Sequence, residues 1–405
     1  MATTTTATDA GILIGNTAAA NAAAYLAWRG ATANYNQELL FDVAGTYQFP
    51  AETLSLQQGC ILRGVNGVTL QCADAGGWFV GPMYGYCNQF ELRNLTLNGS
   101  GNANYVVRSV GGVAKPSPIL EQVTMTNAVV ACFGCYNVYC RLRDCVTSGA
   151  PVGFLFESCS ESIAYNLVAN THSDASMRIV GFLDEIGSPS PTQANGGRMS
   201  VFGFRTSVQG SYGVDIRGVG QSDLHGVTSE GASAAAVRIR GKSSNIRIYG
   251  YRSNSGLAVQ FDGCFNCVVD GGCVSTQRVQ HLNGAYGCMA RLLAEDHRAA
   301  YDIEQDWVTG GTTWTGKVRL DGTIVGVTSG QPTAGTWSAG SRVEQHVCVT
   351  GGSPGIWGAT DGEFSGGVNQ SAKSAYAKIR NDAPYRLVTV EMLRELLKDL
   401  DQATD

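Results

Sequence analysis

The chain has 405 residues, 52 of them glycine, and only 15% of its residues are charged. Its 28 lysines and arginines stand against 33 acidic residues, which excludes the basic surface of a nucleic-acid-binding protein. It has no run of about eighteen apolar residues and no cationic start before an apolar core, so we expect neither membrane insertion nor a secretory signal. This composition favours many tight turns, and an all-β chain of this length can form one domain.

The first predicted elements lie before residue 73. Residues 1–14 are small and polar, so we expect them to become ordered only against another surface. The alanine-rich run NTAAANAAAYLAWR at 16–29, with Gly30 placed to end it, predicts a helix. LLFDVAGTYQFP at 39–50 and LSLQQGCILRGVNGVTLQC at 54–72 predict strands broken by glycine and asparagine turns.

Units of strand, turn and strand follow in the middle of the chain. They occupy 118–128, 129–149, 153–170 and 177–205, the last stretched by a loop at 187–197. These units carry, in less regular form, the pattern that becomes a clear repeat after residue 212.

The repeat between Tyr212 and Ala294 is the most informative pattern in the sequence. YGVDIRG, AAVRIRG, LAVQFDG and VQHLNG align so that their glycines fall 23, 22 and 21 residues apart, at Gly218, Gly241, Gly263 and Gly284. A second set of apolar residues repeats with nearly the same period, at intervals of 24, 21 and 21 residues: Leu224, Ile248, Val269 and Ala290. Apolar and polar residues alternate within the repeats, and no helix fits between them. The repeat therefore predicts a parallel β-helix whose coils bury their apolar faces on one another, with the helix at 16–29 covering the open end.

The thirteen cysteines are an odd number. Cys267 and Cys288 lie one repeat apart, so we expect them to be neighbours in an inward stack of small apolar groups. The pairs Cys132/Cys135 and Cys264/Cys267 have the local spacing of zinc ligands, but 129 residues separate the pairs and each lies in a strand-rich coil. Packing in a reducing compartment is therefore favoured over a disulfide or metal site, and we expect no metal and no cofactor.

The repeat is lost after Tyr301. Segments 306–327 and 334–364 alternate apolar and polar residues around glycine-rich turns, which is typical of antiparallel strands. The segment 388–402 is strongly helical, and its leucines fall on one side. This stripe needs a partner, either its own subunit or, as we favour, copies of itself. The leucines are Leu393, Leu396, Leu397 and Leu400.

Three stretches resemble the bacteriophage tailspikes and related tail receptor-binding proteins with a pectate-lyase-like right-handed β-helix. The capping helix followed by LLFDVAGTYQF is similar to the family's opening, and LQQGCILRGVNGVTL resembles its first coil. WSAGSRVEQHVCVTGGSPGIW at 337–357 is similar to a tail-end motif in which a β-sandwich region closes on a Gly-x-Pro-Gly-x-Trp turn. The likeness covers residues 15–365, and its motifs concern fold and virion role more than substrate.

The resemblance implies a homotrimer of right-handed parallel β-helices in the virion tail, made in the host cytoplasm, which binds bacterial surface polysaccharide. The chain has almost no N-terminal head domain, a departure from the family that favours docking on the tail through an adaptor protein. The expected domains are a virion-attachment segment (1–14), the capping helix and first strands (15–50), the β-helix (51–305), a sandwich-like β-rich region (306–370) and a segment with a trimerising helix (371–405).

Stacked coils predict columns of outward side chains about 4.8 Å apart, which suit an extended polymer. One expected column is Asp215, Arg238, Gln260 and His281; the next is Arg217, Arg240, Asp262 and Asn283, continued upstream by Glu157 and Asp184. Carboxylates on adjacent coils would have the separation of the acids of a retaining glycosidase, about 5 Å, and longer rotamers or a skipped coil could reach the range of an inverting enzyme. Ordinary surface ion pairs give the same pattern. The candidate catalytic acids are Glu157, Asp184, Asp215 and Asp262.

Arginines and aromatic residues are the expected sugar-binding groups, because arginine donates to hydroxyls and sugars stack on rings. The candidates are Arg217, Arg238, Arg240, Tyr249, Tyr251, Gln260 and His281, with Phe204 as a further aromatic. Three functions stay open: an endoglycosidase or polysaccharide lyase, a glycan-binding protein without cleavage, and a structural tail fibre or virion decoration protein.

Overall fold

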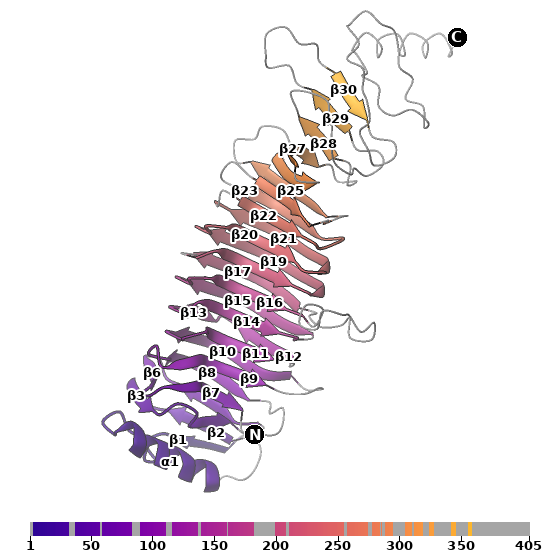
Figure 1. Cartoon of the computed structure of the whole chain (residues 1–405). Coiled ribbons are helices and arrows are strands. Elements are labelled where there is room, and N and C mark those ends of the chain that lie inside the picture. Colours follow the sequence, from indigo (N-terminus) through magenta and orange to yellow (C-terminus); the bar gives the residue numbers. More distant parts are fainter. Residues whose placement is uncertain are drawn as a thin grey trace, which may run out of the picture.

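The computed structural model is a parallel β-solenoid with one helix near the N-terminus among the residues it describes (Figure 1). The described residues are 3–31, 37–56, 59–82, 90–110, 116–136, 139–159, 161–181, 199–207, 210–254, 257–273, 278–283, 285, 288–294, 304–309, 312–318, 324–327, 342–345 and 355–358. Within this part of the chain no helix is long and apolar enough to cross a membrane. The predicted all-β solenoid is confirmed.

In the described residues the strands form two sheets of 15 strands each, and successive coils of the solenoid add strands to both. Sheet A contains β1 (Thr3–Thr6), β2 (Gln37–Phe41), β3 (Gly45–Phe49), β5 (Ile61–Gly64), β6 (Val68–Cys72), β8 (Glu91–Asn98), β10 (Pro116–Thr126), β12 (Tyr139–Arg143), β13 (Val146–Ser148), β15 (Ser162–Asn170), β17 (Met199–Ser207), β19 (Gly220–Glu230), β21 (Ser244–Ser253), β23 (Val268–Cys273) and β25 (Met289–Ala294). Sheet B contains β4 (Leu54–Leu56), β7 (Gly76–Pro82), β9 (Ala103–Val110), β11 (Ala131–Tyr136), β14 (Val152–Glu157), β16 (Ala175–Val180), β18 (Tyr212–Arg217), β20 (Ala235–Arg240), β22 (Leu257–Asp262), β24 (Arg278–Leu282), β26 (Glu304–Thr309), β27 (Thr312–Val318), β28 (Ile324–Val327), β29 (Arg342–Gln345) and β30 (Gly355–Gly358).

The sequence repeat sets the register of the coils. Leu224, Ile248, Val269 and Ala290 stand opposite one another in successive strands of sheet A, and all four are fully buried. The repeat glycines that the structure describes follow the sheet B strands with φ of 61°, 55° and 65°, a left-handed conformation that glycine adopts without strain. They are Gly218, Gly241 and Gly263. The repeat thus marks both the core strip and the corner of each coil, as predicted.

The helix α1 (Ala18–Ala31) caps the first coils, as predicted, although it runs to Ala31 rather than ending at Gly30. The Thr17 hydroxyl accepts from the Ala20 amide at 3.2 Å, which caps the first turn. Tyr25 is fully buried, its ring centroid lies 6.3 Å from that of Phe49, and its hydroxyl donates to the Ser55 carbonyl. The helix therefore covers the apolar end of the solenoid with aromatic side chains.

The N-terminal segment becomes ordered against the chain's own sheet. Strand β1 pairs in parallel with β2, and Thr3 stands opposite Gln37. Ala7 and Ile12 just after it are fully buried in the common core. Residues 1–14 were expected to become ordered only against something else; the described part of this segment instead orders against the first strand of the chain's own solenoid, and virion attachment through it stays a prediction.

Sheet A bends at a fixed position in successive coils. Asn166, Gly203, Gly226 and Gly250 have φ between 51° and 76° in the middle of long strands. The residue before each points outward, and the residue after it is buried. A left-handed residue breaks the alternation of a strand, so side chains two positions apart face opposite ways.

The pairing changes at the C-terminal end. Strands β26 and β27, β27 and β28, and β29 and β30 pair antiparallel, as predicted for this region, whereas β28 and β29 pair in parallel. The expected helix at 388–402 lies outside the described residues.

The cysteines whose side chains are described are all buried and form no disulfide. Cys267 and Cys288 precede Val268 and Met289, which stand opposite each other in sheet A. Their predicted place as neighbours in the inward stack is confirmed.

Candidate functional site

Three successive coils of sheet B bring the predicted polar residues together. They are Asp215 and Arg217 in β18, Arg238 and Arg240 in β20, and Gln260 and Asp262 in β22. The predicted stacking of these six residues is confirmed. Their chemistry depends on which groups they contact.

The fourth coil departs from the predicted register. An irregularity between Leu257 and Val259 shifts β24 by one residue, so Gln280 follows Gln260 in the outer column. His281 stands opposite Phe261, a fully buried core residue, so its placement in the polar column was wrong. Leu282 rather than Asn283 takes the position after Asp262.

Asp215 is fully buried although it lies on the outer side of its strand. Arg178 donates through Nε to its Oδ2 at 3.0 Å, and Arg240 donates through two nitrogens at 2.9 and 3.0 Å. These hydrogen bonds are the main reason why the pKa of Arg240 is raised. A carboxylate enclosed by two guanidinium groups is a structural ion pair rather than an acid exposed to a substrate.

Asp262 and Arg238 form a second pair in this region. Arg238 donates to the Asp262 carboxylate at 3.0 Å and to the Tyr212 hydroxyl at 2.9 Å, and its guanidinium lies 5.2 Å from the Tyr212 ring centroid. The Asn283 amide donates to the other Asp262 oxygen. Both oxygens of this carboxylate therefore have partners.

We use the term arginine face for four arginines and the Asp215 and Asp262 carboxylates between them. The arginines are Arg178, Arg217, Arg238 and Arg240. The pKa of Arg217 is lowered because burial removes water from its guanidinium and because the other three arginines repel its charge. The mutual repulsion of the arginines indicates that positive charge is concentrated here. The buried Asp215 carboxylate offsets part of this charge.

Glu157 lies apart from Asp215. It accepts from Arg108 at 2.7 Å and stands opposite Val180, which in turn stands opposite Arg217. Val180 occupies the next position after Glu157 in this column, and Asp184 lies outside the described residues. Asp215 and Asp262 are two coils apart, so the described acids form no pair on adjacent coils; the skipped coil corresponds to the inverting alternative, in which the two carboxylates would have to be free to act.

A column of stacked rings, here called the aromatic ladder, runs along the outer side of sheet A. Of its four members, only Tyr249 was among the candidate residues. Tyr165, Phe202, His225 and Tyr249 stand opposite one another on successive coils. Neighbouring ring centroids are 5.2, 5.1 and 5.3 Å apart, and the rings are stacked. Tyr165 is 44% exposed and Phe202 is 38% exposed. The four residues form a continuous ridge in contact with solvent.

Charged columns flank the aromatic ladder on both sides. Asp223 and Arg247 stand opposite each other two residues before it, and both are exposed. Beyond the bend, Arg205, Thr228 and Arg252 stand on successive coils, and the two arginines are exposed. The ladder is therefore an apolar ridge between polar groups, with an excess of positive charge.

Tyr251 was wrongly grouped with Tyr249. It is fully buried, and its hydroxyl donates to the Ala258 carbonyl at 2.9 Å. Phe204 is also buried, with its ring centroid 6.4 Å from that of Phe154. Both follow a left-handed glycine, so each faces inward.

The ladder has a sequence signature. Each member precedes the left-handed residue and then a buried apolar one, as in YNL, FGF, HGV and YGY. An aromatic or histidine residue before Gly or Asn, repeated once per coil, is the signal that could have located it.

A scan against protein-family models and a search of curated proteins found no match. Among solved structures, the A-module of the mannuronan C-5 epimerase AlgE6 of Azotobacter vinelandii has a TM-score of 0.54 at 16% identity and covers 71% of this chain and 93% of its own. Geobacillus virus E2 ORF18 has a TM-score of 0.50 at 10% identity, covering 89% and 74%. Tailspike protein 3 of bacteriophage CBA120 has a TM-score of 0.46 at 12% identity, covering 88% and 68%. The likeness at these identities is one of fold: the chain shares a β-solenoid with the epimerase A-module and with ORF18.

Proposed function

We propose that the chain is a receptor-binding protein of a phage tail that holds bacterial surface polysaccharide along the aromatic ladder. The observation that carries this proposal is the exposed ridge of Tyr165, Phe202, His225 and Tyr249, which extends over four coils with charged side chains on both flanks. An extended polymer lying along the solenoid meets the same kind of contact on each coil.

The ridge suits sugars because it combines apolar edges with polar tips. The ring faces stack on one another, so a ligand meets the ring edges, the tyrosine hydroxyls and the His225 imidazole. Ring edges pack against the C–H groups of a sugar, and flanking side chains hydrogen-bond its hydroxyls. Because Arg205, Arg247 and Arg252 outnumber Asp223 and Asp270, which stands opposite Tyr249 on the next coil, the surface favours a polysaccharide with carboxylate, sulfate or phosphate groups.

The rest of the assembly follows from the resemblance to tailspikes. In this proposal the chain is a homotrimer of right-handed β-helices in the virion tail, made in the host cytoplasm. The segment 388–402, which the sequence predicts to be helical and which lies outside the described residues, joins the subunits in this proposal. The N-terminal end docks on the tail or an adaptor protein. Because β1 is the first strand of sheet A, the attachment surface includes that strand together with β2.

Binding without cleavage is favoured over depolymerisation by the state of the candidate acids. Asp215 is enclosed by two arginines, and Asp262 and Glu157 are each held by one. A general acid needs a reachable carboxyl group whose pKa is matched to the reaction. The alternative is a structural tail fibre or decoration protein, a role that does not account for the exposed aromatic ladder.

The test incubates the purified full chain with envelope polysaccharide from candidate host bacteria. Binding is measured by retention on the immobilised glycan, and the soluble glycan is sized by chromatography after incubation. We expect retention that competes with free polysaccharide and leaves its size unchanged. Shortened chains would replace this proposal with the depolymerase, and the absence of retention on the polysaccharide of a host that the phage infects would favour the structural role.

A further inference from the structure

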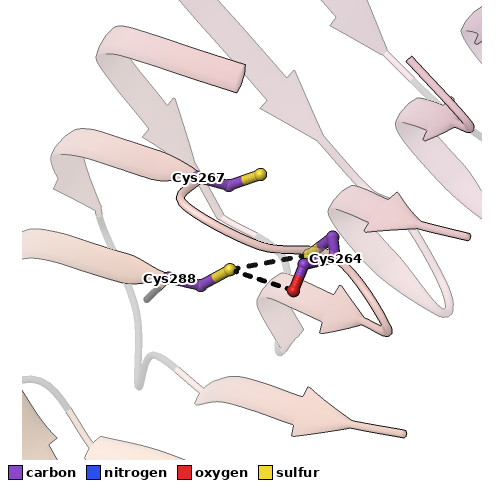
Figure 2. A group of neighbouring side chains, drawn as sticks. All are labelled: Cys264, Cys267 and Cys288. Atoms are coloured by element: carbon purple, nitrogen blue, oxygen red, sulfur yellow. Dashed lines mark hydrogen bonds between the residues drawn. The ribbon is translucent and has the colours of Figure 1, made fainter. Parts of the chain in front are cut away.

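Three cysteine side chains converge at one corner of the solenoid (Figure 2). Cys264 lies in the turn after β22, while Cys267 and Cys288 immediately precede β23 and β25. The turn therefore brings the first two together, and the stacking of coils adds the third. All three are buried.

The sulfur atoms have the spacing of a shared metal ion. All three Sγ atoms lie within 4.8 Å of one another, and the Sγ atoms of Cys264 and Cys288 are 3.7 Å apart. Three sulfurs that each bind one ion at about 2.3 Å are separated from one another by about 3.8–4.0 Å. Small side-chain rotations therefore suffice to place an ion between them.

The surroundings favour a soft ion held by thiolates alone. Among the residues that the structure describes, no histidine or carboxylate joins the trio. Thiolate-only sites select ions such as Cu⁺ and Zn²⁺ over the hard ions that prefer oxygen.

A second group of cysteines, at an earlier corner of the solenoid, shows that neighbouring cysteines do not by themselves form a metal site. The Cys135 Sγ atom lies 2.9 Å from that of Cys159 and 3.8 Å from that of Cys140. That group does not bring three sulfurs within mutual reach of one ion, whereas the later trio does so within the described part of the chain. The earlier group is therefore a control of the same residue type and burial, with Cys135 placed within β11 instead of in a turn.

We propose that Cys264, Cys267 and Cys288 form a structural binding site for a single soft metal ion, with Cu⁺ and Zn²⁺ as the probes. This inference is independent of the proposed glycan binding. Binding displaces the thiol protons to solvent and joins two coils near the end of the regular repeat. The ion then stabilises the last coils against separation.

The experiment titrates the reduced full-length protein under anaerobic conditions with Cu⁺ or Zn²⁺ in competition with a chromophoric chelator. Bound metal is counted by mass spectrometry, and Tm is measured with and without the ion. We expect one equivalent of Cu⁺ or Zn²⁺ per chain and a higher Tm in its presence. Cys288→Ala should weaken binding more than about 10- to 100-fold, since even losing an outer partner of a ligand costs that much. Cys135→Ala should leave stoichiometry and affinity unchanged.

X-ray absorption of the metal in the wild-type protein keeps the test independent of how well the variants fold. We expect three sulfur neighbours at about 2.3 Å. The proposal is overturned if neither ion binds, if Cys288→Ala binds metal as well as the wild type, or if nitrogen and oxygen dominate the coordination shell.

Discussion

The arginine face of sheet B and the aromatic ladder of sheet A are built by the same stacking rule and differ in what their members do to one another. On sheet B, charged residues form ion pairs with residues of opposite charge on the next coil, and two arginines bury Asp215. On sheet A, the rings stack, yet Tyr165 and Phe202 keep 44% and 38% of their surface in solvent. A column of equivalent residues can bind a ligand only when its side chains keep surface and polar groups that their neighbours in the column do not occupy.

The bend in sheet A explains how the ladder arises. In β21, Tyr249 faces solvent and Tyr251 faces the core, although a regular strand would place both on one side. Gly250 between them has a φ of 63° and turns the chain. The two tyrosines thus offer a comparison of core and surface within one strand.

The largest effect is expected for Tyr251→Ala. Removing a fully buried ring and its hydrogen bond to Ala258 should lower the free energy of unfolding by about 4 kcal/mol, as for other large aromatic truncations. Tyr249→Ala should cost less than about 1 kcal/mol, because the ring is partly solvated and only stacks on His225. Chemical denaturation of both variants measures the difference, and equal losses would contradict the assignment of one to the core and one to the surface.

The next effect concerns Asp215→Asn. The change leaves Arg178 and Arg240 facing each other without the carboxylate that joins them, at an expected cost of about 3 kcal/mol. This is the low end for a buried pair, because the two arginine side chains are 22% and 24% exposed and retain some water. Denaturation is again the measurement. A loss below about 1 kcal/mol would mean that the arginine face is an ordinary surface network.

A smaller effect is the pH dependence of stability that a buried histidine outside both faces should cause. His172 is fully buried, its Nδ1 donates to the Ala150 carbonyl at 2.9 Å, and its Nε2 lies 3.0 Å from the Thr147 hydroxyl. Burial lowers the pKa of His172, so the unfolded chain takes up the proton first. Stability should therefore fall as the pH drops below about 6.5, by at most about 1.4 kcal/mol per pH unit.

The control for this pH dependence is a pair of variants. His172→Gln should remove the loss between pH 6.5 and 5, whereas His225→Gln in the aromatic ladder should keep it. If His172→Gln shows the same slope as the wild type, the dependence comes from other groups.

The sequence reveals the core strip and the corners because glycine and apolar residues recur at nearly constant intervals, as at Gly218, Gly241 and Leu224. It did not reveal the ladder, because the alternation rule assumes a regular strand and the left-handed Gly250 breaks that rule. The position of His281 failed for a related reason: the irregularity after Leu257 shifts the next strand by one residue. Nor does periodicity show that Asp215 is enclosed, because its partner Arg178 comes from a coil that the regular repeat does not include.

The most direct test of the central claim compares the affinity of the two faces for host polysaccharide. Isothermal titration calorimetry should be run on the wild type, on Phe202→Ala with Tyr249→Ala, and on Arg217→Ala with Arg238→Ala, each checked for folding by circular dichroism. We expect the ladder variant to lose at least about fivefold in affinity, since each aromatic contact contributes about 0.5–1.5 kcal/mol, while the variant of the arginine face stays within about twofold of the wild type. The reverse result, with binding lost on sheet B and kept on sheet A, would contradict the account.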